Sequence, residues 1–526
     1  MTNFRIAYLL ALAQAIAGQD ATSPVRWTLP SDASNAQAVY KGYIGFGIEM
    51  KSFPDYTGTD TPNQFSNYLL SLLADRTGNA PIHIRVGGTS MDSSIYDPSF
   101  NETWKKTPQG KDCRLHTQVT LGKPWVEKTF GNLNSSFTRY TIDVPLARLN
   151  KTNGIEFANA CINAMPSKTS QLDAVEIGNE PNLYTSFPNP PCATNDRPSG
   201  WNASDYSRQW TTYAKNLTDN VQALKNSGRK DWFQTLALSS GYKVDDWTFA
   251  DFWDQLKQDG YIKTISQHYY QTDAKGSVTD YPIAHANTVN VLETKFRRNL
   301  NFTKNRNTPF ILGEVGTVVS SSNANSESQD LYNSLGSALW TFDFLLYGMS
   351  MGINRVSMQM ATGFKISAWK PAKGKEVHGS FYGLVAGAEF IGEGEDLQIQ
   401  ALSTQGHENI AGYAGFSGGK LAKVAVLNLH FWNETNATLE DRPKRNIALG
   451  GLGNDVSSVR VSTLTASNGT PDHNITWAGK RWTAEGDGKE YQSGPKPVVI
   501  DVRNGAPVRN LTVGASEAVL VEIVRN

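Results

Sequence analysis

The segment that decides the fold is Val175-Glu176-Ile177-Gly178-Asn179-Glu180-Pro181-Asn182, a short apolar run that stops at a glycine and continues into polar residues. A run of this kind is typical of a buried β-strand followed by a loop. The same pattern returns in Phe310-Ile311-Leu312-Gly313-Glu314-Val315-Gly316. In both segments a glutamate, Glu180 or Glu314, follows the glycine at the expected end of the strand. Each carboxylate is therefore predicted to lie at the rim of a dry scaffold, where its surroundings can tune its pKa.

Six further β-like runs accompany these two, and amphipathic stretches separate them. The strand candidates are Tyr43–Glu49, Ile82–Val86, Tyr140–Arg148, Ala174–Ile177, Thr235–Ser239, Thr264–Tyr269, Phe310–Gly313 and Arg355–Gln359, and the helix candidates are Gln64–Arg76, Tyr206–Lys225, Phe249–Gln258, His285–Arg298 and Gln329–Tyr347. This alternation predicts an α/β protein with a (β/α)8 TIM barrel over residues 41–390. A doubly wound sheet would also alternate, but the glycine-rich phosphate loop that usually follows its first strand is missing.

The pattern changes near residue 390, where helical periodicity stops and short alternating runs separated by Gly, Asn and Asp begin. The strand candidates there are Lys423–Leu429, Val456–Leu464, Pro497–Val502 and Ala518–Ile523. They predict a C-terminal antiparallel β-sandwich domain over residues 391–526. Val25–Leu29, within the N-terminal segment 19–40, is a candidate to add a strand to it. Without a low-complexity linker, the two domains are expected to pack directly together.

The composition is that of a globular protein with a large core. Hydrophobic residues make up 39% and charged residues 19% of the 526 residues, and Lys+Arg and Asp+Glu both total 49. A net charge of zero gives no overall field that would attract nucleic acid or an anionic membrane. We therefore predict neither as a partner.

The N-terminus has the features of a secretion signal, which we assign to residues 1–18. Arg5 supplies a positive charge, Ile6–Ile16 is a short apolar run, and Ala15-Ile16-Ala17 fits a cleavage site. An N-terminal core helix is the alternative. N-linked glycosylation is expected as well, because eleven Asn-x-Ser/Thr sites are present: Asn101, Asn134, Asn150, Asn202, Asn216, Asn301, Asn433, Asn436, Asn468, Asn474 and Asn510. Together the two signals predict a secreted, extracellular glycoprotein.

Three cysteines allow at most one internal disulfide. Cys161 lies in an apolar helical pattern and is expected to be a buried thiol. Cys113 and Cys192 lie in loop-like stretches and are the better candidates for a pair. Nothing in the sequence resembles a metal cluster or a redox pair, so we predict no metal and no cofactor.

The chemistry is predicted from Glu180 and Glu314 together. Barrel enzymes carry their catalytic residues at the C-terminal ends of the strands. Glycoside hydrolysis needs one protonated carboxyl to donate to the departing oxygen and one carboxylate on the other side of the scissile bond. If the two carboxyl groups lie about 5–5.5 Å apart, the carboxylate attacks directly and the configuration is retained. The alternative for either glutamate alone is a surface or ion-paired residue.

At this point the sequence resembles glycoside hydrolase family 79, the β-glucuronidase and heparanase family, within the large clan of retaining barrel glycosidases. Four segments carry the resemblance, in this order: Ile84-Arg85-Val86-Gly87-Gly88-Thr89, Glu176-Ile177-Gly178-Asn179-Glu180-Pro181-Asn182, His268-Tyr269-Tyr270 and Leu312-Gly313-Glu314. The resemblance extends over about residues 40–395, and the trailing β-domain also suits the family. The Asn-Glu-Pro element alone indicates only the clan, whereas the ordered set of four is more specific.

The resemblance implies a role for each matching residue. Glu180 matches the acid/base and Glu314 the nucleophile. Asn179 matches the residue that hydrogen-bonds the sugar 2-hydroxyl, and Tyr269 the tyrosine that donates to the nucleophile. Glu49 matches an acidic residue that binds ring hydroxyls.

Other residues have weaker assignments or competing structural interpretations. Gln359 lies where the family has another polar sugar contact. Tyr269 has an alternative role in packing at the barrel rim, and Glu49 in a structural salt bridge with Arg85. Arg85 is expected to orient carboxylates in the floor of the site, and His268 to be a buried hydrogen-bonding residue.

One stretch departs from the family. Heparanase-type members have a Tyr followed by glycines after the nucleophile, which help to hold the uronate carboxylate, whereas this chain has Val318-Val319-Ser320-Ser321-Ser322. Serine or backbone donors there, or Lys365 and Trp369 after the eighth strand, are the candidates to replace them. The difference argues against heparanase activity.

The preferred function is that of a secreted, retaining exo-β-glucuronidase acting on terminal glucuronic acid, with or without a 4-O-methyl group, in glycans or glycoconjugates. Three alternatives stay open. They are another retaining β-glycosidase of the clan (xylosidase, glucosidase or arabinofuranosidase), a heparanase-like endo-β-glucuronidase, and a carbohydrate-binding wall protein without activity.

Overall fold

The computed structural model describes residues 24–106, 119–147, 149–185, 197–240, 247–272, 283–318, 333–433 and 441–526. The predicted secretion signal, Cys113, Cys192, Asn436 and residues 319–322 of the divergent loop lie outside these ranges. Within them, no helix is both long and apolar enough to cross a membrane.

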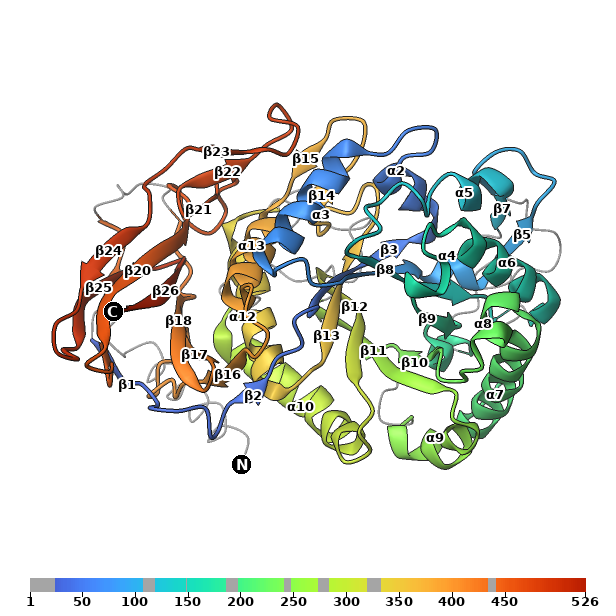
Figure 1. The fold of residues 1–526 in the computed structure, drawn as a ribbon, viewed down its shortest axis with the longest axis horizontal. Helices are drawn as coiled ribbons and strands as arrows, with labels where there is room; N and C mark the ends of the chain where they lie inside the picture. The colour runs from blue at the N-terminus through green and yellow to red at the C-terminus, as the bar shows by residue number, and fades with distance from the viewer. Residues whose placement is uncertain are drawn as a thin grey trace, which may run out of the picture.

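Eight parallel strands close into a barrel, which confirms the predicted fold class (Figure 1). In chain order they are β3 (Ile44–Glu49), β4 (Ile82–Gly87), β8 (Thr138–Val144), β9 (Leu172–Ile177), β10 (Phe233–Leu238), β11 (Ile262–Thr272), β12 (Phe310–Val318) and β13 (Arg355–Met360). The order around the barrel follows the chain, and β13 pairs with β3 to close it. The third strand begins and ends earlier than the predicted Tyr140–Arg148: it runs over Thr138–Val144, and Pro145, which cannot donate a ladder hydrogen bond, follows its last residue.

Helices cover the outside of the barrel. They are α3 (Gln64–Arg76), α6 (Lys151–Ala164), α7 (Ala203–Asn220), α8 (Gln222–Ser227), α9 (Phe249–Leu256), α10 (His285–Lys304), α12 (Leu335–Met351) and α13 (Gly379–Ile391). Short helices α2 (Phe53–Thr57), α4 (Thr89–Asp92) and α5 (Lys123–Glu127) lie in the loops after β3 and β4. Cys161 is buried in α6 with a free thiol, as predicted.

Two helices separate the barrel from the β-domain. α12 and α13 pack against each other between β13 and the strands of the β-domain (Figure 1). Almost every residue of both helices is buried. A helix that is apolar on all sides must be covered on all sides, and this position provides that cover.

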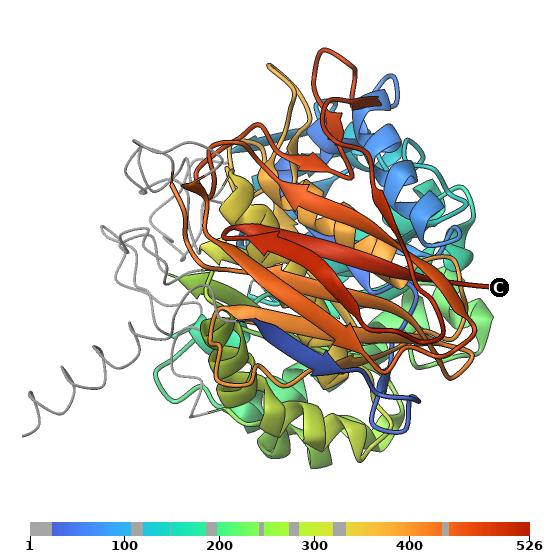
Figure 2. The same cartoon turned by 90° about the vertical axis from the view of Figure 1, so that its left-hand side faces the viewer.

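The β-domain consists of two sheets. The larger contains β2 (Gln37–Ala38), β16 (Gln398–Ala401), β17 (Ile410–Ser417), β18 (Lys420–Asn428), β20 (Val456–Thr465), β21 (Thr476–Trp477), β22 (Lys480–Trp482), β23 (Glu490–Gln492), β24 (Val498–Asp501) and β26 (Glu517–Arg525), and the smaller β1 (Val25–Thr28), β19 (Lys444–Gly450) and β25 (Val508–Gly514). Apolar side chains from both sheets share one cluster, as in a sandwich. β1 lies beside the C-terminal strands (Figure 2), and it pairs with β19 in parallel, whereas antiparallel pairing was predicted for this domain.

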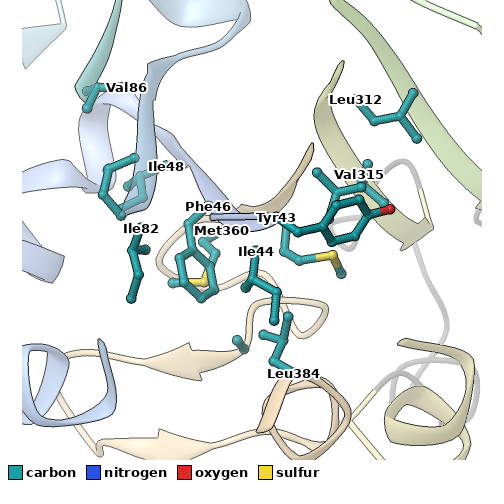
Figure 3. Close-up of a cluster of buried hydrophobic side chains, with 14 of the residues drawn as sticks. Tyr43, Ile44, Phe46, Ile48, Ile82, Val86, Leu312, Val315, Met360 and Leu384 are labelled. Atoms are coloured by element: carbon teal, nitrogen blue, oxygen red, sulfur yellow. The ribbon is translucent and has the colours of Figure 1, made fainter. Parts of the chain in front are cut away.

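The outer face of β3 and its neighbours packs against the helices that cover the barrel. Phe46, Ile48 and Met360 belong to one apolar cluster with Leu384 of α13 (Figure 3). Because successive strand residues face opposite sides, Gly47, Glu49 and Gln359 face the barrel interior, which leaves that side of the strand ends to carry function.

A buried histidine–carboxylate pair, contacted by a tyrosine of the β-domain, joins the barrel to that domain. His285 of α10 lies 3.0 Å from the carboxylate of Asp343 in α12, and Tyr413 of β17 donates a 2.6 Å hydrogen bond to the same carboxylate. Burial alone would lower the pKa of His285, but Asp343 outweighs it and raises that pKa above its ordinary value.

Candidate active site

Glu180 and Glu314 come together at the C-terminal ends of β9 and β12. One oxygen of each carboxylate and one ring nitrogen of His268 all lie within 4.8 Å of one another. This distance is close to the spacing of carboxyl groups in retaining glycosidases and well below the roughly 6.5–9.5 Å of inverting ones. The arrangement therefore leaves room for one anomeric carbon between the two carboxyl groups and too little for an intervening water.

The backbone of both segments is irregular where the glutamates lie. Gly178 has a φ of 79°, and Glu180 itself has a φ of 48°, in the left-handed region that non-glycine residues rarely adopt. The amide of Glu180 is fixed there by donating to the carbonyl of Ala237, at 3.0 Å.

Gly313 explains how Glu314 reaches the site. A Cβ on Gly313 would lie 2.2 Å from the hydroxyl of Ser266 and 3.4 Å from the side-chain nitrogen of Gln234, so this residue faces the crowded barrel interior. In a regular strand the next residue would then face outward. The pairing of β12 with β13 shifts register between Leu312 and Val315, and this bulge turns Glu314 toward the mouth as well.

Glu314 is held as a carboxylate. Its Oε1 accepts a 2.5 Å hydrogen bond from the hydroxyl of Tyr270, and its Oε2 accepts a 2.9 Å hydrogen bond from Arg85. Burial alone would raise the pKa of Glu314, but His268, Arg85 and Tyr270 together outweigh burial and hold that pKa below its ordinary value. A buried carboxylate that stays ionised suits a nucleophile.

Tyr270, and not Tyr269, is the tyrosine at the nucleophile. Along β11 the side chains alternate, so His268 and Tyr270 face the site while Tyr269 faces the surrounding helices. The ring of Tyr269 stacks on Phe344 with centroids 5.6 Å apart. Its hydroxyl donates to Gln271. The prediction for Tyr269 as the donor is thus wrong, and its alternative role in packing is correct.

Burial and the charge of Glu314 raise the pKa of Tyr270 well above its ordinary value. The hydroxyl therefore stays protonated and remains a donor to Glu314 at any working pH. Sequence reasoning missed Tyr270 because the motif contains two adjacent tyrosines. The alternation that begins at His268 is the signal that separates them.

Glu180 has a different neighbour. Its Oε1 lies 3.0 Å from Nδ1 of His268, and 17% of its side chain is exposed. His268 is itself buried between the two carboxylates, with Nδ1 3.9 Å from Glu314. The two glutamates thus have unequal surroundings, one tied to a guanidinium and a phenol and the other to an imidazole and solvent, as an acid/nucleophile pair requires.

Arg85 organises the floor of the site, as predicted. Besides Glu314 it donates to Glu176, through Nε at 2.8 Å, and to the Oδ1 of Asn179 at 2.7 Å. Gln234 donates to the other oxygen of Glu176. The nucleophile and two groups near it are therefore fixed by one buried guanidinium.

The same contacts bear on cation binding. The oxygens of Glu180 and Glu314 and the nitrogen of His268 are close enough to surround a metal ion. However, both oxygens of Glu314 already accept hydrogen bonds, and the positive charge of Arg85 at 2.9 Å would repel a second cation. The donor set fits a catalytic pair better than a metal site.

Asn179 is held in place from both sides. Its amide nitrogen in the side chain donates to Thr89 at 3.2 Å, and its backbone N–H donates to Asp92 at 2.9 Å. The other oxygen of Asp92 accepts from the backbone of Leu146 at 2.8 Å. Asp92, which sequence reasoning missed, therefore ties the end of β9 to the loop after β8.

Glu49 lies at the end of β3 but does not pair with Arg85. Its carboxylate accepts hydrogen bonds from the hydroxyl of Ser90 and from the backbone of Lys51, and the ammonium of Lys51 is 3.6 Å away. Burial raises the pKa of Glu49 in spite of these donors. The alternative of a Glu49–Arg85 salt bridge is wrong, because Arg85 is already engaged by Glu176 and Glu314.

The remaining candidates lie near β13. The side-chain oxygen of Gln359 occupies the space where a Cβ on Gly47 would lie, 2.7 Å away, and it has no hydrogen-bond partner among the described residues. Lys365 is half-buried in the loop that follows. Trp369 is buried against Phe46 and donates to Ser66, so it packs in the core and is not available to a sugar.

Comparisons with known proteins bear on the whole chain. Residues 412–520 match the model of the glycosyl hydrolase family 79 C-terminal β-domain. The chain is 26% identical to a β-glucuronidase of Neurospora crassa over 508 residues, 87% of each chain. It is also 26% identical to a β-glucuronidase of Aspergillus niger over 557 aligned positions, which cover 98% of this chain and 95% of the relative.

Solved structures share the fold. A 4-O-α-L-rhamnosyl-β-D-glucuronidase from Fusarium oxysporum superposes with a TM-score of 0.77 at 20% identity, over 95% of this chain and all of the other. An α-L-arabinofuranosidase from Thermotoga maritima gives a TM-score of 0.58 at 14% identity, over 94% of this chain and 99% of the other. Barrel and β-domain thus occur together in proteins of very different sequence.

Proposed function

Because the chain is a glycoside hydrolase and its resemblance to glycoside hydrolase family 79 is confirmed, we propose that it is a secreted, retaining exo-β-glucuronidase. The proposed substrate is a glycan or glycoconjugate that ends in β-linked glucuronic acid, with or without a 4-O-methyl group. One observation carries the mechanism: one carboxylate oxygen of Glu180 and one of Glu314 lie within 4.8 Å of each other at the barrel mouth. The curated relatives named β-glucuronidase support the sugar.

The proposed reaction has two steps. Glu314 attacks the anomeric carbon while the carboxylic acid of Glu180 protonates the departing glycosidic oxygen, which leaves a covalent glycosyl ester on Glu314. Glu180, now a carboxylate, then removes a proton from a water as that water attacks the same carbon. The ester bond breaks, Glu314 is restored, and the product keeps the β configuration.

The surrounding residues have defined tasks in this scheme. Tyr270 and Arg85 keep Glu314 ionised and fix its direction. In this proposal the side chain of Asn179 hydrogen-bonds the sugar 2-hydroxyl, a contact that strengthens as the ring approaches the oxocarbenium-like transition state. Glu49 and Gln359 are the proposed partners of other ring hydroxyls.

The uronate carboxylate needs a partner of its own. We assign it to Lys365 in the loop after β13, because this ammonium lies in a segment that follows a catalytic strand and the Tyr-Gly element of heparanase-type members is missing. The proposal of secretion and N-glycosylation rests on the first 18 residues and on the eleven glycosylation sites, and residues such as Asn202 and Asn510 are exposed in the fold.

Hydrolysis of p-nitrophenyl β-D-glucuronide at pH 4–5, beside the glucoside, xyloside and galactoside, tests this function. Release from the glucuronide alone is the expected result. Release from a neutral glycoside would keep the two glutamates and overturn the sugar assignment. Depolymerisation of heparan sulfate would indicate endo action, and glycan binding without any turnover would support the wall-protein alternative.

A further inference from the structure

A groove of about 590 Å³ lies on the outer face of the small sheet of the β-domain, and the proposed reaction does not use it. The sheet has β19 in the middle, with β1 on one side and β25 on the other. Its inner face contributes Val25, Ile447 and Leu511 to the apolar cluster of the sandwich, so the outer face is the one that meets solvent. Figure 1 shows β1 and β25 on the side of the β-domain away from the barrel, and Figure 2 views the domain from that side. The groove is therefore separate from the catalytic pocket.

Small residues of β19 form the floor of the groove. Ala448 and Gly450 face outward, because Leu449 between them is buried. Arg26 pairs in register with Ala448 and Thr28 with Gly450, so one wall of the groove comes from β1. A Cβ on Gly450 would lie 3.7 Å from the nearest atom outside its own chain neighbours, which is an ordinary contact distance. The space above this floor is therefore open.

The opposite wall is shaped by a bulge in β25. The pairing of β19 with β25 shifts register between Ile447 and Leu449, so that the single residue Ala448 lies opposite two residues, Arg509 and Asn510. Both of these side chains are exposed, whereas in a regular strand one of them would face the apolar core. The bulge therefore keeps a second guanidinium at the rim of the groove, across the floor from the arginine of β1.

These two arginines set the charge of the groove. Arg26 and Arg509 lie on opposite sides of Ala448, and no carboxylate is among the residues that line the groove. Adjacent strands lie about 4.8 Å apart, so the backbones that carry the two arginines are about 10 Å apart. Other exposed arginines, such as Arg208 and Arg460, are paired with carboxylates. Within the described ranges neither guanidinium of the groove has such a partner, so both are available to an anion.

The arrangement suits an acidic polysaccharide better than other polyanions. A planar guanidinium binds a carboxylate through two parallel hydrogen bonds. The surface around the two arginines is uncharged, and Thr28, Asn446 and Thr512 can hydrogen-bond sugar hydroxyls there. Double-stranded DNA carries one charge per about 1.7 Å of its axis and would need a denser set of cations. A chain of sugars, in which neutral hydroxyl-bearing faces separate the carboxylates, matches both the charge and the floor.

We propose that this groove binds a polysaccharide that contains uronate residues, with Arg26 and Arg509 each pairing with one carboxylate. The groove then keeps the enzyme on the polymer from which the barrel removes terminal glucuronate. The choice of a uronate ligand rests on the proposed function, whereas the shape and charge of the groove do not depend on it. The β-domain thereby gains a role in binding besides covering α12 and α13.

Binding is measured by isothermal titration calorimetry with polyglucuronate, an unsulfated homopolymer of glucuronic acid, and with a neutral glucan of the same length. The protein carries Glu314→Gln to prevent turnover, and saturating free glucuronate occupies the catalytic pocket. Polyglucuronate is expected to bind and the glucan is not. Arg26→Ala and Arg509→Ala should each weaken binding about three- to fivefold, and the two together about tenfold or more. Lys225→Ala combined with Arg298→Ala removes two exposed cations from α8 and α10, outside the groove, and should leave binding unchanged.

Three outcomes of the titration would overturn the inference. Equal weakening in the two double variants would show that overall charge accounts for binding. Equally tight binding of the neutral glucan or of a DNA duplex would exclude recognition of uronate. Asn510, at the rim of the groove, is also a predicted glycosylation site, so the protein is titrated before and after enzymatic removal of N-linked glycans. Binding that appears only after removal would show that the groove is covered in the glycoprotein.

Activity provides the second measurement. With Glu314 in place, the double variant of Arg26 and Arg509 should keep kcat/KM on p-nitrophenyl β-D-glucuronide and release glucuronate from dilute polyglucuronate about tenfold more slowly. An unchanged rate on the polymer would overturn the inference and leave the proposed function intact. If no glucuronide is cleaved by any variant, the proposed function fails, and the titration still decides whether the groove binds the polymer.

Discussion

Loss of the Tyr270 hydroxyl should move the acidic limb of the pH–rate profile to higher pH. This limb reports ionisation of the nucleophile in the free enzyme, because Glu314 must be a carboxylate to attack. The pKa of Glu314 lies below its ordinary value because Arg85, His268 and Tyr270 outweigh burial. Removing one of these three stabilising groups raises that pKa, so the enzyme needs a higher pH to reach the same activity.

The size of the effect follows from the 2.5 Å hydrogen bond between Tyr270 and Glu314. A hydrogen bond to a charged group contributes about 1.5–3 kcal/mol. A free energy of about 1.4 kcal/mol corresponds to a factor of ten. Tyr270→Phe should therefore raise the pKa of Glu314 and lower kcat/KM on the acidic limb by about ten- to a hundredfold, with Arg85 keeping the carboxylate in place.

The assay is kcat/KM for p-nitrophenyl β-D-glucuronide between pH 3 and 8. Tyr269→Phe is the matched control, since it removes the neighbouring hydroxyl that donates to Gln271 and should leave the limb in place. A limb that moves in Tyr269→Phe and stays in Tyr270→Phe would show that the assignment of the two tyrosines is reversed. A limb unmoved in both would show that Tyr270 does not control the ionisation of Glu314.

Three further results are expected. Glu314→Ala and Glu180→Ala should each lose several orders of magnitude in kcat. Azide should rescue Glu314→Ala with formation of an α-glycosyl azide, and Glu180→Ala, on an activated substrate, with formation of a β-glycosyl azide. The opposite products would show that the two roles are reversed. Gly313→Ala should lower the free energy of unfolding in urea by about 1–3 kcal/mol, because its Cβ meets a facing hydroxyl at 2.2 Å, while Gly200→Ala, with nothing within 4 Å, should be close to neutral. His285→Gln should lower the free energy of unfolding by about 3 kcal/mol at pH 5 and by less at pH 9. The reason is that a raised histidine pKa gives stability that is present at acidic pH and lost as the pH rises through that pKa. An equal loss at both pH values would exclude a charged pair.

Periodicity in the sequence was enough to predict the barrel. Each parallel strand is buried on both faces and reads as a short apolar run, and the helices between them repeat with a different period. For the same reason α3 was predicted with the bounds Gln64–Arg76 that the structure has. The parallel pairing of β1 with β19 could not be predicted, because it joins residues more than 400 positions apart and depends on how the two sheets stack.

The two glutamates could be predicted from the sequence alone, because a strand end followed within two residues by a glycine and a glutamate is a local pattern. Arg85 and Asn179 could be predicted in the same way, through their motifs. The partners of these residues depend on the folded chain. Whether Tyr269 or Tyr270 reaches Glu314 depends on which face of β11 is inside the barrel, and the approach of Glu314 itself depends on a bulge in β12. Catalytic candidates can be predicted from a motif of neighbouring residues, whereas the direction of a side chain depends on the register of strands that are distant in the chain.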